Sequence, residues 1–117
     1  MRSYRMIKTI GLLARKPGWS HAAFMDHWVR VHAPLAHAIP GLRRYVQNHM
    51  AGERSRADIP ALELGAEIDG IAELWFDDRA AWERALASPE MKALHEDGAR
   101  FIGRIRSYVV EEHSVIA

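Results

Sequence analysis

Apolar residues recur along the chain with two different spacings, which separate predicted strands from predicted helices. Short apolar or alternating segments bounded by turn residues are typical of strands, and they occupy residues 6–14, 42–50, 70–76 and 106–115. Apolar residues at helical spacing follow Ser20 and again follow Asp78, with an interruption and restart at Ser88 and Pro89. The predicted order is therefore strand, helix, strand, strand, helix, strand.

This order is that of the ferredoxin-like βαββαβ fold, in the α+β class. It predicts an antiparallel sheet with two helices on one face, built by a single domain over residues 1–117. Residues 51–69 lack sustained periodicity and are predicted to form a long loop. A loop of this length in a compact domain is usually functional or covers another part of the molecule.

The first helix carries the clearest inward stripe. Ser20 is a good N-cap, and the stripe is predicted at Phe24, Trp28, Val31 and Leu35. His32 falls on or beside this stripe, whereas His21, His27 and His37 are expected to be solvated. Because proline disfavours helical geometry in the preceding residue, Pro34 predicts that the regular helix ends or kinks at His32.

The strand at residues 70–76 is apolar on both sides. Ala72, Leu74 and Phe76 alternate with Ile71 and Trp75, and Glu73 is the one polar residue among them. Helices on one face alone would leave Ile71 and Trp75 in water. A second copy of the chain is the simplest cover, so the sequence predicts a homodimer joined through the sheet faces.

Composition excludes several classes of partner. A formal net charge of +1 and scattered basic residues give no reason to expect nucleic acid. No apolar run approaches the ~18 residues of a membrane span, so no membrane association is expected. The chain has no cysteine, which excludes disulfides and thiolate chemistry and fits a reducing compartment such as the cytoplasm.

His32 is the leading catalytic candidate. A helix C-terminus favours its protonated ring, while burial against Trp28 and Phe24 favours the neutral ring. An imidazole balanced between these states near neutral pH is a competent general acid or base. The alternative is a core histidine that hydrogen-bonds a backbone carbonyl.

The strand at residues 42–50 places four polar side chains on one face: Arg43, Tyr45, Gln47 and His49. Side chains two apart on a strand are separated by roughly 6.6 Å, so Tyr45 and Gln47 can meet one small ligand. The alternative is that these long side chains reach solvent. The histidines do not show the i, i+4 spacing of helical zinc sites, so no metal is predicted.

The segment HWVRVHAPLAHAIPGLRRYVQNH resembles the first helix and following strand of the EthD family of small dimeric α+β-barrel proteins. DIPALELGAEIDGIAELWF and EDGARFIGRIRSYVVEE extend the similarity, in particular to the 4-methylmuconolactone methylisomerases, which are related to the EthD group. The resemblance covers residues 6–112. It implies a dimeric α+β barrel, and it places the histidine at the end of the first helix of those isomerases on His32, their strand tyrosine on Tyr45 and their third-strand cysteine on Leu74.

The resemblance also implies a pocket for a small aromatic or lactone-like catabolite. The expected function is a cofactor-independent isomerisation, lactone rearrangement or cyclisation in which His32 moves a proton and Tyr45 donates a hydrogen bond to an oxygen. Trp28, Leu74 and Phe76 would form apolar walls. Because leucine cannot transfer protons as a thiol does, a non-catalytic EthD-type accessory or small-molecule-binding protein is the alternative.

Overall fold

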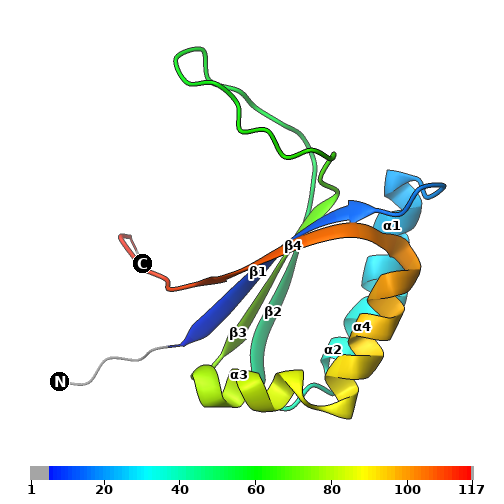
Figure 1. Cartoon of the computed structure of the whole chain (residues 1–117), viewed down its shortest axis with the longest axis vertical. Coiled ribbons are helices and arrows are strands. Elements are labelled where there is room, and N and C mark those ends of the chain that lie inside the picture. Colours follow the sequence, from blue (N-terminus) through cyan, green and yellow to red (C-terminus); the bar gives the residue numbers. More distant parts are fainter. Residues whose placement is uncertain (1–5, 117) are drawn as a thin grey trace.

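A four-stranded antiparallel sheet forms one layer of the protein and the helices form the other (Figure 1). The computed structural model describes residues 6–116, so the ends of the predicted domain, residues 1–5 and 117, lie outside it. The strand order is β2-β3-β1-β4, and each neighbouring pair is antiparallel. The strands are β1 (Ile7–Arg15), β2 (Leu42–His49), β3 (Gly70–Phe76) and β4 (Ile102–Val110).

The helical layer contains two segments, as the sequence predicts. The first consists of α1 (His21–His27), a π-helical segment η1 (Trp28–His32) and α2 (Ala33–Ala36). The second consists of α3 (Arg79–Leu86) and α4 (Pro89–Phe101). Ser20, Asp78 and Ser88 are the N-caps, and each side-chain oxygen accepts a backbone N–H three residues later. The ferredoxin-like α+β fold is confirmed.

Of the two outcomes predicted at His32, an end or a kink, the end is wrong, although the helix is irregular up to this residue because η1 is a π-helix. Helical geometry continues to Ala36, and Pro34 lies in the first turn of α2. A proline is tolerated there because the N–H that it lacks is not needed at the start of a helix. The π turn provides this start, since the Ala33 N–H bonds to the Trp28 carbonyl five residues earlier.

The π turn also changes which residues face inward. The buried residues are Phe24, Trp28, His32 and Ala36, each four apart, whereas Val31 is 40% exposed. The predicted inward position of Val31 is therefore wrong, and that of Leu35 holds only in part because its side chain is partly buried. The predicted stripe assumed regular α-helical spacing, but the wider π turn keeps every fourth residue on the inner side.

The last strand begins earlier than predicted. β4 starts at Ile102, directly after Phe101 ends α4, and stops at Val110 rather than Val115. This direct transition brings Gly103 against the first strand, where an added Cβ would lie 2.8 Å from the Arg15 carbonyl oxygen. A side chain would not fit at this position, so glycine permits the close approach of the two strands.

Trp28 occupies the centre of the layer between helix and sheet. Its side chain is completely buried and packs with Phe24, Leu13 and Phe101. The indole lies directly over Gly70, the first residue of β3, where an added Cβ would come within 2.7 Å of Cη2 and closer still to Cζ3. The absence of a side chain at Gly70 therefore sets how closely the first helical segment approaches the sheet.

Residues 51–69 form a long loop between β2 and β3, as predicted. The loop projects beyond the end of the sheet, away from the helical layer (Figure 1). Residues 51–65 are all exposed, whereas Asp69 at the end of the loop is buried and contacts Arg15 of β1 and His21 of α1. That the exposed part of the loop is functional or covers another surface stays a prediction.

We predict that Gly70→Ala destabilises the protein by about 1–3 kcal/mol, because the new methyl group overpacks the fixed indole of Trp28. The measurement is the free energy of unfolding in urea. Gly52→Ala is the matched control, because nothing lies within 4 Å of a Cβ at Gly52. Equal stability of the two variants would contradict the packing constraint.

Candidate functional site

The inward-facing imidazole of His32 is held by a carboxylate from the other helical segment. His32 is 7% exposed, and its Nδ1 lies 2.8 Å from Oδ2 of Asp97, which is 3% exposed. A carboxylate only accepts hydrogen bonds, so Nδ1 carries the hydrogen and donates it. In the neutral ring the Nε2 lone pair is then free, which is the tautomer that a general base requires.

Asp97 also binds a second imidazole. His27 Nε2 lies 3.1 Å from each carboxylate oxygen of Asp97, and Arg100 lies 3.7 Å from Oδ1. The His27 side chain is only 17% exposed and contacts the rings of Trp19 and Phe101. The prediction that His27 is solvated is therefore wrong. The π turn brings His27 and His32, which are five residues apart, to the same side.

Burial lowers the pKa of His32 below its ordinary value of 6.5. Desolvation is the largest cause, and the positive fields of His27 and His95 act in the same direction, while the hydrogen bond and negative charge of Asp97 oppose them. The ring therefore favours its neutral form near neutral pH. Burial, which favours the neutral ring, therefore outweighs the interactions with Asp97 that favour the charged ring.

The second nitrogen of His32 has no partner within the described part of the chain. Nε2 has no hydrogen bond to any of residues 6–116. Within that range, every fully enclosed side-chain nitrogen or oxygen has a partner. Nε2 is therefore not fully enclosed, and an added Cβ at the neighbouring Gly98 would make ordinary van der Waals contact with Cε1 of the ring, at 3.7 Å.

Tyr45, Gln47 and His49 form a hydrogen-bonded row on the helix-facing side of β2. Gln47 Nε2 donates to the Tyr45 hydroxyl and to the Trp28 carbonyl, each at 2.9 Å, and Gln47 Oε1 lies 3.1 Å from His49 Nε2. Burial raises the pKa of Tyr45 above 10, although hydrogen bonds with the side chains of Gln47 and Trp28 lower it. The phenol therefore stays protonated, and its own hydrogen is available to a ligand.

Arg43 does not belong to this row. The pairing of β2 with β3 shifts between Leu42 and Arg44, so Arg43 is the extra residue of a bulge. Its side chain is 61% exposed and binds Asp77 at 2.8 Å. The prediction that Arg43 shares a pocket face with Tyr45 is therefore wrong, because strict alternation along the strand does not survive the bulge.

The predicted apolar walls lie on the same face as Tyr45. Leu74 pairs directly with Tyr45 across β2 and β3, and Phe76 is almost completely buried two residues further along. Trp28 is sealed by protein, and its ring stacks on His49 with centroids 5.1 Å apart. Trp28 is therefore completely buried beneath His49 and does not reach the surface. Leu74 is only partly buried, so part of its side chain remains accessible.

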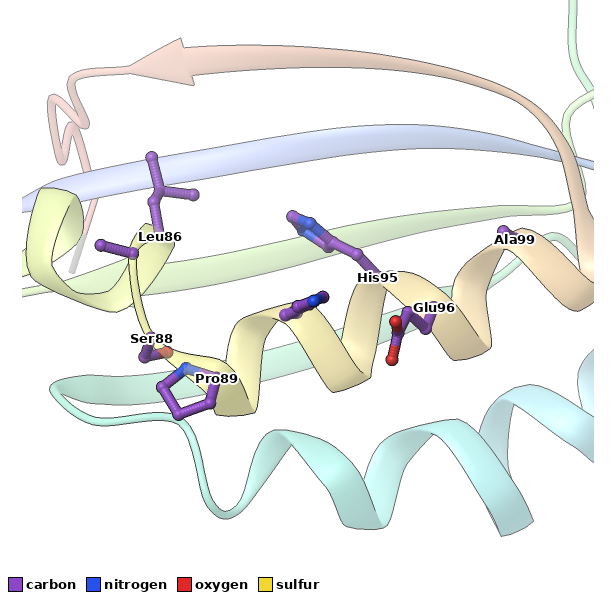
Figure 2. Close-up of a pocket in the computed structure, with 8 residues that line it drawn as sticks. Leu86, Ser88, Pro89, His95, Glu96 and Ala99 are labelled. Atoms are coloured by element: carbon purple, nitrogen blue, oxygen red, sulfur yellow. The ribbon is translucent and has the colours of Figure 1, made fainter.

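An open groove of about 680 Å³ runs along the outer flank of α4, past the end of α3. Figure 2 shows Leu86 and His95 pointing to the same side of these helices, above Ser88 and Pro89. None of the predicted site residues lines this groove. His95 still connects the groove with the site electrostatically, since its charge lowers the pKa of His32.

The donor set does not suit a metal ion. In the part of the chain that the structure describes, no three His, Asp or Glu side chains are grouped as metal ligands. Asp97 already accepts hydrogen bonds from both neighbouring imidazoles.

No helix of the described chain is long and apolar enough to span a bilayer.

Asp97 is the candidate site residue that the sequence pattern did not identify. It lies three residues after Leu94 and four before Phe101, both of which are buried, so it occupies the apolar face of α4. A charged residue on such a face requires a partner. That signal was available in the sequence, although the identity of the partner histidines was not.

Comparison with known proteins identifies relatives of this chain. A family model described as the EthD domain matches residues 16–105. The chain is 34% identical to the 4-carboxymethyl-4-methylbutenolide mutase of Pseudomonas reinekei, over 92% of this chain and 98% of that protein.

Solved structures share the fold. An EthD family protein from Bacillus halodurans has a TM-score of 0.72 and 28% identity, over 92% of this chain and 99% of its own. A dimeric ferredoxin-like protein from Thermobifida fusca has a TM-score of 0.69 and 16% identity, over 93% of this chain and 92% of its own. At 16% identity the similarity concerns the fold alone.

We predict that His32 makes the protein less stable in mild acid. Its pKa is below 6.5 in the folded state, so the unfolded chain binds more protons and stability rises as pH increases toward 6.5 and above. Between pH 5 and pH 7 the free energy of unfolding should therefore rise less steeply in His32→Gln than in the wild type. His37→Gln, which alters an exposed histidine of the same segment, should keep the wild-type slope. Equal slopes for all three proteins would contradict the placement of His32.

Proposed function

This chain belongs to the EthD family, and we propose that it is a cofactor-independent enzyme that isomerises a small lactone or a related cyclic catabolite. The observation that carries the proposal is the buried His32–Asp97 pair, in which a neutral imidazole is oriented with Nε2 free. The similarity to a butenolide mutase over almost the whole of both chains supports a lactone as the substrate class.

The proposed chemistry is a proton transfer next to a carbonyl group. Nε2 of His32 takes a proton from the carbon beside the lactone carbonyl, and the bonding electrons move onto the carbonyl oxygen to give an enolate. The imidazolium then returns the proton at another position, so the substrate rearranges without a net change in formula. Asp97 holds the ring in place and stabilises the charge that the ring acquires.

Tyr45 would stabilise the enolate oxygen. Its hydroxyl oxygen already accepts a hydrogen bond from Gln47, so its own hydrogen can be directed to a substrate oxygen. The row ending in His49 fixes the Gln47 amide and hence the phenol. Leu74 and Phe76 would give the substrate ring an apolar wall beside Tyr45.

We predict that His32→Gln lowers turnover of a methyl-substituted butenolide or muconolactone by about 10²–10⁴-fold, because the proton acceptor is lost. Tyr45→Phe should lower turnover by roughly ten-fold or more, because one enolate hydrogen bond is lost. Product formation is measured by NMR on each purified variant.

His37→Gln is the matched control for this experiment, because His37 is exposed at the end of the same helical segment. It should keep wild-type turnover. Wild-type turnover in His32→Gln would remove His32 from the mechanism, whereas binding of the lactone without any turnover by the wild type would indicate a binding protein instead.

We also propose that the protein acts as a homodimer joined through the sheet faces that the helices leave open. One reason for expecting this needs correction: Trp75 is 6% exposed within its own chain. Lys8 and Arg44 lie over its ring, each at 4.5 Å, and its N–H donates to Glu112. Lys8, Arg44 and Glu112 therefore shield the Trp75 ring from water within one chain, whereas the sequence predicted that only a second copy would do so.

Other apolar residues on this face still support the dimer. Ile10, Leu12, Val46 and Ile71 are partly buried, and Tyr108 is 45% exposed. Their positions in the strand pairing put them on the side of Trp75, opposite the helices. The Thermobifida protein with the same fold is dimeric, which is consistent with this use of the sheet.

We predict that Ile71→Lys raises the dimer dissociation constant at least ten-fold, because a charge would be buried without a partner. Sedimentation equilibrium over a concentration series measures it. Val29→Lys changes an apolar residue that is 48% exposed on the helical side and should leave dissociation unchanged. A wild type that is monomeric at every concentration would contradict the dimer.

A further inference from the structure

The loop between β2 and β3 carries an apolar surface that its own chain leaves in water. Every residue from 51 to 65 is exposed, and we call residues 51–64 the arm. Ile59, Leu62 and Leu64 within it are 51%, 83% and 50% exposed. Three large apolar side chains on one short exposed segment mark a contact surface rather than scattered surface residues.

The arm is held at its base and free beyond it. Arg104 donates to the Gly65 carbonyl at 2.8 Å, Arg15 binds Glu67 at 2.8 Å, and the Met50 N–H donates to the Asp69 carbonyl at 3.0 Å. In contrast, the side-chain hydrogen bonds of the arm itself join only Arg56 and Asp58 within it. The base therefore sets the direction of the arm, and among residues 6–116 no hydrogen bond joins the arm to the rest of its own chain.

The direction of the arm favours a second copy of this chain as its partner. The arm extends on the side of the sheet away from the helical layer, which is also the side of the open sheet face (Figure 1). An arm on that side of one protomer reaches past its own sheet toward whatever packs on that face. In a two-fold symmetric dimer the same contact is made twice.

The charge of the arm disfavours an anionic partner. Residues 51–64 contain two arginines, which are Arg54 and Arg56, and three acidic residues, which are Glu53, Asp58 and Glu63. Nucleic acid and anionic membranes select segments with an excess of positive charge, and this segment has none. Its apolar side chains match the partly buried apolar residues of the sheet face instead.

We propose that the arm is a clasp, in which Ile59, Leu62 and Leu64 of each protomer pack against the other protomer beside the sheet interface. This proposal rests on the homodimer proposed above and adds a second, separate contact to it. In the dimer the clasp converts an exposed apolar segment into buried surface, which slows dissociation.

The test compares two paired substitutions by sedimentation equilibrium of the full chain. Leu62→Ser with Leu64→Ser should raise the dimer dissociation constant at least ten-fold. Val29→Ser with Val31→Ser removes two exposed apolar side chains from the helical side and should leave it unchanged. The arm lies outside the core, so circular dichroism should show unaltered secondary structure in the arm variant.

A second measurement uses the absence of cysteine from the sequence. In Leu62→Cys the single thiol should react with a maleimide at least ten-fold more slowly above the dimer dissociation constant than in dilute monomer. In Val29→Cys the rate should be the same at both concentrations.

The outcomes separate the two proposals. A dimer that Ile71→Lys dissociates but that the arm variant does not, with a thiol at position 62 that reacts equally fast at both concentrations, overturns the clasp alone. A wild type that remains monomeric overturns both the clasp and the dimer. Weaker dimerisation of the arm variant together with protection of the thiol supports the clasp.

Discussion

A carboxylate shared by two imidazoles fixes how the first helical segment lies against α4. Asp97 is 3% exposed, and a buried charge of this kind is tolerated only when several hydrogen bonds replace its hydration. His27 and His32 supply those hydrogen bonds from one direction. The same contact that stabilises the carboxylate therefore orients His32, so the packing of the helices and the orientation of the candidate base share one cause.

The π turn is what makes this arrangement possible. In a regular α-helix four residues advance by about 400°, so a stripe with a spacing of four drifts around the helix by about 40° at each step. The wider turn over Trp28–His32 offsets that drift and keeps Phe24, His32 and Ala36 inward. The Trp28 carbonyl accepts the Ala33 N–H and also the Gln47 amide, so β2 supports the turn from the sheet side.

The sequence predicted the fold well because strand and helix periodicities, N-caps and turn residues are local signals. It predicted the inward position of His32 and the shared face of Tyr45, Gln47 and His49 for the same reason. The errors arise where a local rule is overridden. Arg43 lies on a bulge, Val31 follows the π turn, and Trp75 is covered by charged neighbours from other strands. The partner of His32 is 65 positions away, which no periodicity reveals.

Leu74 affects which residues of the candidate site can transfer protons. The resemblance to the lactone isomerases places a cysteine at this position, and an isobutyl group cannot exchange a proton in its place. Leucine does contribute burial, because it pairs directly with Tyr45, and burial is the largest cause of the raised pKa of that phenol. A phenol with a raised pKa keeps its hydrogen and can donate it in a hydrogen bond, but it gives that proton up less readily as an acid. Within the proposed mechanism, this leaves His32 to perform both proton transfers while Tyr45 stabilises charge, so the free Nε2 of a single imidazole carries the chemistry.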